Sequence, residues 1–367
     1  MSSLLVEMGN RNSVAEYPEL YFRLKQESSY NRASKTPADS IGWFRNNDFN
    51  NKPGDKNFVR VDTVDGKPEW VLMDHKGPGS IVRTWMPFPK SNKSETDAII
   101  KVYLDGSTVP VIEGNMLEVF NGDGLIPYPF AHKSLRSAVS FFPIPYSKSC
   151  KVTTSEVPYF YQITYREYSA DTRVKTFTMQ DFTDNKDLID KVGDELLASD
   201  ADKLFNSQKT INKRISLDAD EKSSMELNSH NSAIYCLKIK MNPDLLRNST
   251  ALRNLLLNIS FDGMETVNST FSDFFGCGVL LNPYQDRYKE ILETGEFVSK
   301  WVMPFQSVSN VSVINKTGKK LDMDLSVAYH DYPWTKNTMY FHATSRLQKE
   351  VPTRGAERLQ KEGRKTS

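Results

Sequence analysis

Residues 99–106 read Ile-Ile-Lys-Val-Tyr-Leu-Asp-Gly, and this stretch decides the fold. Its first six positions have the apolar and β-favouring residues of a strand. Asp105-Gly106 then gives a strong signal for a tight hairpin turn, because such turns need residues that tolerate a positive φ. The same arrangement returns at residues 255–263, where Leu-Leu-Leu-Asn-Ile-Ser-Phe leads into Asp262-Gly263, 157 residues after Asp105.

Two further pairs of segments repeat in the same order. Residues 142–146 (Phe-Pro-Ile-Pro-Tyr) resemble residues 301–305 (Trp-Val-Met-Pro-Phe), at an offset of 159. Residues 165–168 (Tyr-Arg-Glu-Tyr) resemble residues 329–332 (Tyr-His-Asp-Tyr), at an offset of 164. Three matches at a nearly constant offset indicate an internal duplication. We interpret them as parts of a repeated fold rather than as a site.

Many other short stretches have strand-like patterns and are bounded by turn residues. They lie at residues 58–62, 69–73, 81–85, 138–142, 150–153, 159–165 and 233–240. This pattern predicts a mainly β protein made of two sandwich or barrel modules, with a few short helices.

The distribution of apolar, polar and charged residues along the chain suggests five segments. We predict an N-terminal arm over 1–56 with a helix at residues 16–27 and an ordered loop over 28–56. It is followed by a first β domain over 57–180, a helical connector over 181–228, a second β domain over 229–345, and a charged tail over 346–367. The connector is marked by apolar residues at helical spacing, such as Leu188, Val192 and Leu196.

Composition excludes several classes of protein. The chain has 367 residues and a net charge of +1, without the basic excess of a nucleic-acid-binding protein. Its 3 cysteines give neither a disulfide framework nor zinc spacing, and its 5 histidines form no pair at metal-binding helical spacing. We therefore expect buried cysteines, no metal and no cofactor.

No membrane span and no signal peptide are visible in the sequence. We expect a periplasmic or secreted protein if a signal peptide has been removed, and a cytoplasmic protein otherwise.

Acidic residues in the second half are candidates for hydrolytic chemistry. Glycosidases use two carboxyl groups roughly 5–9.5 Å apart. Asp273, Glu290 and Glu293 are the acids from which such a pair could be drawn, although each could equally be a solvated loop charge. Asp273 opens the unusual stretch Asp-Phe-Phe-Gly-Cys-Gly, which we interpret as a bent strand end that lines a pocket or an interface, or serves only as scaffold.

A second candidate site lies near the N-terminus. Residues 28–32 (Ser-Ser-Tyr-Asn-Arg) and 43–48 (Trp-Phe-Arg-Asn-Asn-Asp) combine aromatic rings with planar donors and acceptors. This mixture is typical of sugar pockets, and it is also compatible with a hydrogen-bonded loop packed on the first module. Arg32 and Asp48 are the substrate-contact candidates here.

These segments together resemble the domain-of-unknown-function 2961 family, part of which is glycoside hydrolase family 172. The resemblance runs from about residue 20 to 355. It is carried by residues 28–32, 77–85, 103–106, 143–150, 161–166, 273–276, 301–305 and 340–343.

The resemblance implies tandem jelly rolls like those of double-jelly-roll capsid proteins, assembled as homotrimers or multiples of trimers. It also implies a carbohydrate ligand, namely fructofuranosyl or arabinofuranosyl linkages, cleaved with retention by two glutamates. The glutamate segments of the family do not occur in this sequence, and Asn31 stands where relatives carry an aspartate.

Three hypotheses follow. The chain binds or frames a furanoside-containing glycan and is incomplete or inactive alone; or it is an enzyme with a relocated acid pair; or it is a structural jelly-roll oligomer without catalytic activity.

Overall fold

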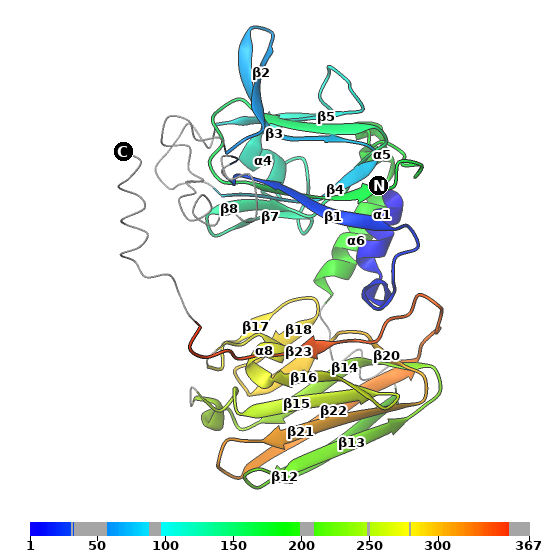
Figure 1. Ribbon diagram of the computed structural model, residues 1–367, viewed down its shortest axis with the longest axis vertical. Helices are drawn as coiled ribbons and strands as arrows, with labels where there is room; N and C mark the ends of the chain where they lie inside the picture. The colour runs from blue at the N-terminus through cyan, green and yellow to red at the C-terminus, as the bar shows by residue number, and fades with distance from the viewer. Residues whose placement is uncertain are drawn as a thin grey trace. The chain divides into compact units, whose positions relative to one another are not determined.

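The computed structural model describes residues 1–30, 32, 57–87, 97–198, 209–247, 250–278 and 280–351 (Figure 1). The chain divides into two units. Unit 1 contains Met1–Gly9 and Leu20–Glu195, whereas unit 2 contains Asn10–Glu19 and the described residues from Leu196 onward.

Unit 1 is built on two antiparallel sheets. One has the strand order β1-β11-β4-β8-β7, with β9 also paired to β4, and the other has the order β2-β3-β10-β5-β6. The strands are β1 Phe22–Ser28, β2 Arg60–Val64, β3 Lys67–Lys76, β4 Gly79–Pro87, β5 Ile99–Leu104, β6 Ile112–Asn115, β7 Ala131–Ser134, β8 Ser137–Ser140, β9 Ile144–Tyr146, β10 Ser149–Thr154 and β11 Gln162–Tyr168.

Unit 2 has the same plan. One sheet has the order β12-β22-β14-β19-β18-β17, with β20 also paired to β14, and the other has the order β13-β21-β15-β16-β23. The strands are β12 Lys209–Leu217, β13 Lys222–Asn228, β14 Ser232–Met241, β15 Leu255–Phe261, β16 Met264–Thr270, β17 Tyr284–Gln285, β18 Lys289–Ile291, β19 Glu296–Ser299, β20 Met303–Phe305, β21 Val308–Asn315, β22 Leu321–Asp331 and β23 Ala343–Thr344.

Both units are jelly rolls by strand order. Eight core strands in each, numbered along the chain, form one sheet in the order first, eighth, third, sixth and a second sheet in the order second, seventh, fourth, fifth. In unit 1 these sheets are β1-β11-β4-β8 and β3-β10-β5-β6. In unit 2 they are β12-β22-β14-β19 and β13-β21-β15-β16. The predicted mainly β fold with two tandem jelly rolls is therefore confirmed.

The repeated Asp-Gly pairs occupy the same turn in both units. Asp105 and Gly106 join β5 to β6 with φ values of 54° and 79°, and Asp262 and Gly263 join β15 to β16 with φ values of 50° and 85°. Positive φ at both central residues defines the hairpin turn that Asp-Gly favours. This explains why the dipeptide marks the repeat.

The other two repeated segments are also equivalent. The proline-containing stretches become β9 and β20, short strands that pair with β4 and β14 respectively. The Tyr-x-x-Tyr stretches end β11 and β22, and the partner strand bulges at the matching position, opposite Tyr165 in unit 1 and Tyr329 in unit 2. The duplication thus extends to a local irregularity of the sheet.

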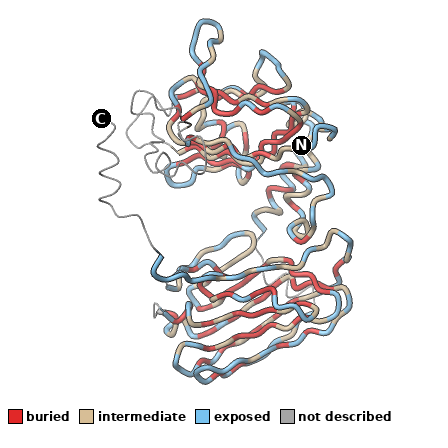
Figure 2. The backbone as a smooth tube through the Cα atoms, in the orientation of Figure 1, coloured by how far each residue is buried: buried red, intermediate tan, exposed pale blue. Residues whose placement is uncertain are grey.

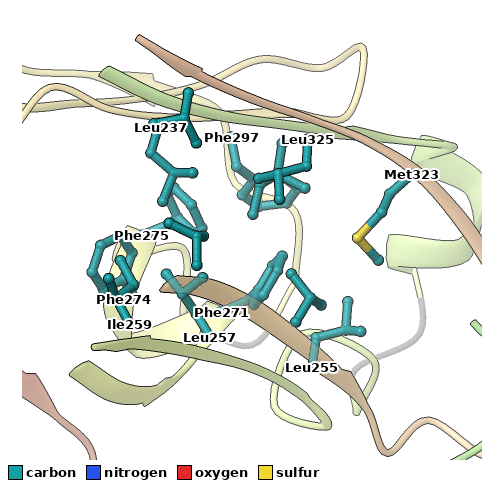
Figure 3. Packing of buried hydrophobic residues seen from close by; sticks show 14 of the residues in the cluster. Leu237, Leu255, Leu257, Ile259, Phe271, Phe274, Phe275, Phe297, Met323 and Leu325 are labelled. Carbon is teal, nitrogen blue, oxygen red and sulfur yellow. The ribbon is translucent and has the colours of Figure 1, made fainter. Parts of the chain in front are cut away.

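Buried apolar residues form the core of each unit. Buried and less buried positions alternate along many strands (Figure 2). In unit 2 the core is rich in phenylalanine, with Phe271, Phe275 and Phe297 in contact around β19 and the helix α8 (Figure 3). Leucines from the facing sheets surround these rings, including Leu237, Leu257 and Leu325.

Five α-helices and two 3-10 helices occur in the described residues. They are α1 Ser2–Gly9, η1 Arg11–Ala15, α4 Met116–Phe120, α5 Met179–Asp184, α6 Lys186–Leu197, η2 Pro243–Arg247 and α8 Phe271–Phe275. None of them is long and apolar enough to cross a membrane.

Part of the predicted N-terminal arm is wrong. Residues 22–28 form β1 rather than the end of a helix at residues 16–27, and the helix of this region is α1. β1 pairs with β11 over its whole length, so its backbone hydrogen bonds are supplied by a strand about 140 positions later. Local propensity gives way to this pairing, and the first jelly roll begins before the predicted boundary at residue 57.

The predicted helical connector is helical only in its first part. α6 confirms the apolar spacing around Val192, but residues 209–217 and 222–228 form β12 and β13, the first two strands of unit 2. Both are edge strands with many exposed polar residues, which is why their pattern resembles a polar connector. Most of the predicted charged tail, from residue 352 onward, lies outside the described residues.

Candidate functional site

The predicted site residues fall in different parts of the chain. Arg32 belongs to unit 1, whereas Asp273 and Glu290 belong to unit 2. Asp48, together with Trp43 and Asn31, lies outside the described residues. No hydrogen bond or ion pair joins Asp273 to Glu290.

Arg32 lies at the end of β1 and is engaged with its own loop. Its guanidinium forms an ion pair with Glu27 at 3.1 Å and donates a hydrogen bond to the hydroxyl of Tyr161 at 3.3 Å. It also lies over the ring of Tyr30, 4.6 Å from the ring centroid. Through these contacts Arg32 holds the ring of Tyr30 and connects the end of β1 to the residue before β11.

Asp273 lies in a short helix rather than at the bent strand end that we predicted. Thr270 caps α8 by accepting a hydrogen bond from the amide of Asp273, and Gly276 ends the helix with a φ of 76°. The hydrophobic members of the stretch, Phe274 and Phe275, are buried in the core, while the carboxylate of Asp273 is exposed. The aromatic pair therefore serves packing.

Glu290 lies beside a buried lysine. The side chain of Lys300 is 0% exposed, and its amine is 3.9 Å from the Glu290 carboxylate. Burial lowers the pKa of Lys300, an effect that Glu290 opposes and that Arg11 reinforces. The third acid, Glu293, is exposed at the turn between β18 and β19.

A group of polar and aromatic side chains, which sequence reasoning did not single out, gathers on the outer face of the β1-β11-β4-β8-β7 sheet. Directly opposite residues of neighbouring strands point to the same face. The register pairs Trp85 with Gln162, Arg83 with Thr164, and Thr164 with Gln26. Because Thr84 and Met86 are buried in the core, these residues face outward. We name them the Trp85 face.

The Trp85 face has the chemistry of a sugar-binding surface. Trp85 offers a half-buried indole ring, and planar polar groups surround it. Arg83 Nη1 donates to Gln162 Oε1 at 2.9 Å, which fixes the Gln162 amide and leaves its Nε2 donor for another partner. The hydroxyl of Thr164 donates to Gln26 Oε1 at 3.4 Å. An aromatic platform beside planar donors is a common way to bind a sugar ring and its hydroxyls.

The other end of this sheet face is occupied by the N-terminal helix. Glu7 of α1 holds Arg166 with two hydrogen bonds of 2.7 and 2.9 Å, and Arg166 lies 4.2 Å from the centroid of the Phe22 ring. Leu5 of the same helix is fully buried. The covering helix therefore restricts a binding surface on this sheet to the end that carries Trp85.

The equivalent face of unit 2 lacks the polar and aromatic side chains of the Trp85 face. Relative to the shared bulge, Cys236, Lys238 and Ala328 take the places of Arg83, Trp85 and Thr164. Cys236 and Ala328 are buried. The segment Asn10–Glu19 contacts this side, since Ala15 packs on Ala233 and Arg11 donates to the carbonyl of Lys300. Of these two equivalent faces, that of unit 1 therefore carries the polar and aromatic group among the described residues.

The sequence contained a signal for this face. Arg83 and Trp85 alternate with core residues in the predicted strand at residues 81–85, and Gln162 and Thr164 do so in the predicted strand at residues 159–165. What the pattern could not show is that β4 and β11 are neighbours, because strand pairing over some 80 residues depends on the completed fold.

Metal and thiol chemistry find no support in the described residues. They contain no group of three metal-ligating side chains. The three cysteines are free and buried, as predicted. Burial raises the pKa of Cys236 to about 12 and that of Cys277 to about 11, so neither thiol is activated.

The fold and the strand order define a tandem jelly-roll protein. Residues 20–185 match the family model described as the GH172 first beta-sandwich domain, and this relates unit 1 to glycoside hydrolase family 172. The matched segment contains the whole Trp85 face and Arg32. No curated protein matches the chain.

Solved viral structures are similar only at low TM-scores. The major capsid protein P2 from bacteriophage PM2 aligns at 8% identity over 77% of this chain and 98% of its own length, with a TM-score of 0.20. The STIV MCP aligns at 9% identity over 74% and 96%, with a TM-score of 0.19. A structure of infectious bursal disease virus Gt strain aligns at 11% identity over 90% and 77%, with a TM-score of 0.18. The jelly-roll assignment rests on strand order, not on these alignments.

Proposed function

We propose that this chain is a glycoside-hydrolase-like protein that binds a glycan containing furanosides, of fructofuranosyl or arabinofuranosyl type, on the Trp85 face. The observation that carries the proposal is the outward row formed by Trp85, Gln162 and Arg83 within the segment that matches the GH172 first beta-sandwich domain. A glycan that stacks on the indole would bury its apolar ring face, and its hydroxyls would bond to the neighbouring amide and guanidinium.

Trp85→Ala should weaken binding of such a glycan at least about tenfold, because aromatic anchors dominate the energetics of binding surfaces. The measurement is isothermal titration calorimetry with fructofuranosyl and arabinofuranosyl oligosaccharides. Trp334→Ala, which removes a half-buried tryptophan from unit 2, is the matched control and should bind like the wild type. If Trp85→Ala binds the glycan with an affinity within twofold of the wild type, the glycan site is not on the Trp85 face.

Hydrolysis is a separate question, tested on aryl furanosides. If the chain alone is active through an acid pair drawn from Asp273, Glu290 and Glu293, at least one of Asp273→Asn and Glu290→Gln should abolish turnover, since every such pair contains Asp273 or Glu290. Activity that neither substitution changes would exclude these acids. Absence of turnover with glycan binding intact would define a binding protein, and absence of both would favour a structural jelly-roll oligomer.

A further inference from the structure

Arg83 differs from the other half-buried arginines of unit 1 because the described residues offer it no carboxylate partner. Arg32 forms an ion pair with Glu27, and Arg166 forms one with Glu7. Arg83 has a single hydrogen-bond partner among the described residues, the neutral side-chain oxygen of Gln162. Four of the five N–H groups of its guanidinium are thus left without a protein acceptor in this part of the chain.

This arrangement is unfavourable without a ligand. A guanidinium that is half removed from water loses hydration, and a neutral amide oxygen only partly compensates for it. The planar fork of N–H groups matches two oxygens of a carboxylate, a sulfate or a phosphate, which can accept two parallel hydrogen bonds.

Among the residues that the structure describes, no acidic side chain of the Trp85 face compensates the positive charge of Arg83. The other members of the Trp85 face, Gln26, Trp85, Gln162 and Thr164, are neutral. Glu27 points to the opposite face of β1, as its register with the buried Ile163 shows, and it is engaged with Arg32. As far as the described residues go, the Trp85 face therefore carries one unpaired positive charge next to an aromatic ring.

We propose that the glycan bound on the Trp85 face carries an anionic oxygen group, and that Arg83 binds this group while the sugar ring stacks on Trp85. The chemical class is an acidic saccharide, with a carboxylate, a sulfate ester or a phosphate ester beside the stacked ring. This inference rests on the proposed glycan binding and adds the substrate class to it.

The test compares neutral and acidic saccharides of similar size on the folded full chain. Calorimetric titrations would use a neutral furanoside oligosaccharide, a uronate-containing oligosaccharide, a sulfated sugar and a sugar phosphate, so that the three anionic groups are distinguished. We expect at least one acidic saccharide to bind about ten- to a hundredfold more tightly than the neutral one. Raising NaCl from about 0.05 M to about 0.5 M should shrink this preference, because salt screens the ion pair.

Arg83→Gln should remove the preference for the acidic saccharide, so that the variant binds the acidic and the neutral saccharide with affinities within about threefold of each other. Arg214→Gln is the matched control: it removes the same charge from unit 2, where Arg214 is paired with Asp324 in an exposed ion pair. The control should keep the full preference. Circular dichroism and thermal unfolding of both variants would show that they are folded.

The outcomes separate the two proposals. If the neutral furanoside binds the wild type at least as tightly as every acidic saccharide, or if Arg83→Gln keeps the preference, the acidic-ligand inference is wrong and the binding function stands. If no saccharide binds to the folded chain, both proposals fail.

Discussion

Replacing Asp262 with alanine should destabilise unit 2 by about 2–4 kcal/mol, because the substitution removes several charge-assisted hydrogen bonds at once. The Asp262 carboxylate accepts the amide N–H groups of Gln306, Ser307 and Val308 at 2.7 to 3.0 Å. It also accepts the hydroxyl of Tyr340 at 2.9 Å. One side chain in the β15–β16 turn therefore fastens the start of β21 and the segment after β22.

The effect should depend on pH in a defined direction. Burial raises the pKa of Asp262, but the three amides and Tyr340 outweigh it and hold the pKa below its ordinary value. A carboxyl group whose pKa is lower in the folded state contributes stability above its unfolded value, near pH 4, and loses it as the pH falls through the folded value. The difference in stability between the wild type and Asp262→Ala should thus shrink in acid.

Urea denaturation at neutral and acidic pH would measure the difference in unfolding free energy between the wild type and Asp262→Ala, with tryptophan fluorescence and circular dichroism as probes. Asp273→Ala is the control, since the exposed Asp273 carboxylate has no bonding partner among the described residues, and it should change stability by less than about 0.5 kcal/mol. Equal effects of the two substitutions would contradict the role given to Asp262.

An equivalent aspartate in unit 1 makes the same kind of hydrogen bonds, so the prediction can be tested a second time in this protein. Asp105 accepts the amides of Ser147, Lys148 and Ser149 at 2.6 to 3.1 Å, and the hydroxyl of Thr176 also bonds to it. Asp105→Ala should therefore destabilise unit 1 by a similar amount.

The second large effect is expected at Glu69 of β3. Glu69 is 4% exposed. Its carboxylate accepts hydrogen bonds from the amine of Lys101 at 2.8 Å, the hydroxyl of Thr153 at 2.8 Å and the hydroxyl of Tyr103 at 3.1 Å. All four side chains lie on the outer face of the β2-β3-β10-β5-β6 sheet. They form one buried network in which each donor depends on the same acceptor.

Glu69→Leu should destabilise unit 1 by about 3–5 kcal/mol, because it leaves a charge and two hydroxyls without their acceptor in a buried place. Burial raises the pKa of Glu69, but Lys101, Thr153 and Tyr103 lower it by more, so the contribution is present above the unfolded value and is lost in acid. Urea denaturation is the measurement. Glu113→Leu, which removes only the exposed partner of Lys101 at 3.5 Å, is the matched control and should have a small effect.

Individual strands and their repeat could be predicted from the sequence because their signals are local. The Asp-Gly pairs require their own backbone geometry, and strand alternation reflects burial on one face. The edge strands β1 and β12 were missed because exposed strands lack a clear alternation, and their identity depends on the distant partners β11 and β22. α1 was missed for a similar reason, since its burial depends on Leu5 packing against the completed unit.

The candidate site shows the same division between local and long-range information. Arg83 and Trp85 could be placed on one face of their strand from alternation alone, but not beside Gln162. The polar segments at residues 28–32 and 43–48 contain Arg32, whose contacts connect its own loop and Tyr161, and Asp48, which lies outside the described residues. Residue types typical of sugar binding are also typical of ordered loops, so composition could not separate the two.

The assignment of Asn10–Glu19 to unit 2 has a consequence for folding during synthesis. Glu16 accepts a hydrogen bond from Tyr332, 316 residues further along, and Ala15 packs in the same small cluster as Val302. At roughly 5–20 residues per second, the ribosome needs about 16–60 s to reach Tyr332 after Glu16 has been made. Unit 1 can fold in that interval, while the segment Asn10–Glu19 still lacks its contact residues in unit 2. We expect the N-terminal segment to be among the last parts of the protein to acquire its native contacts.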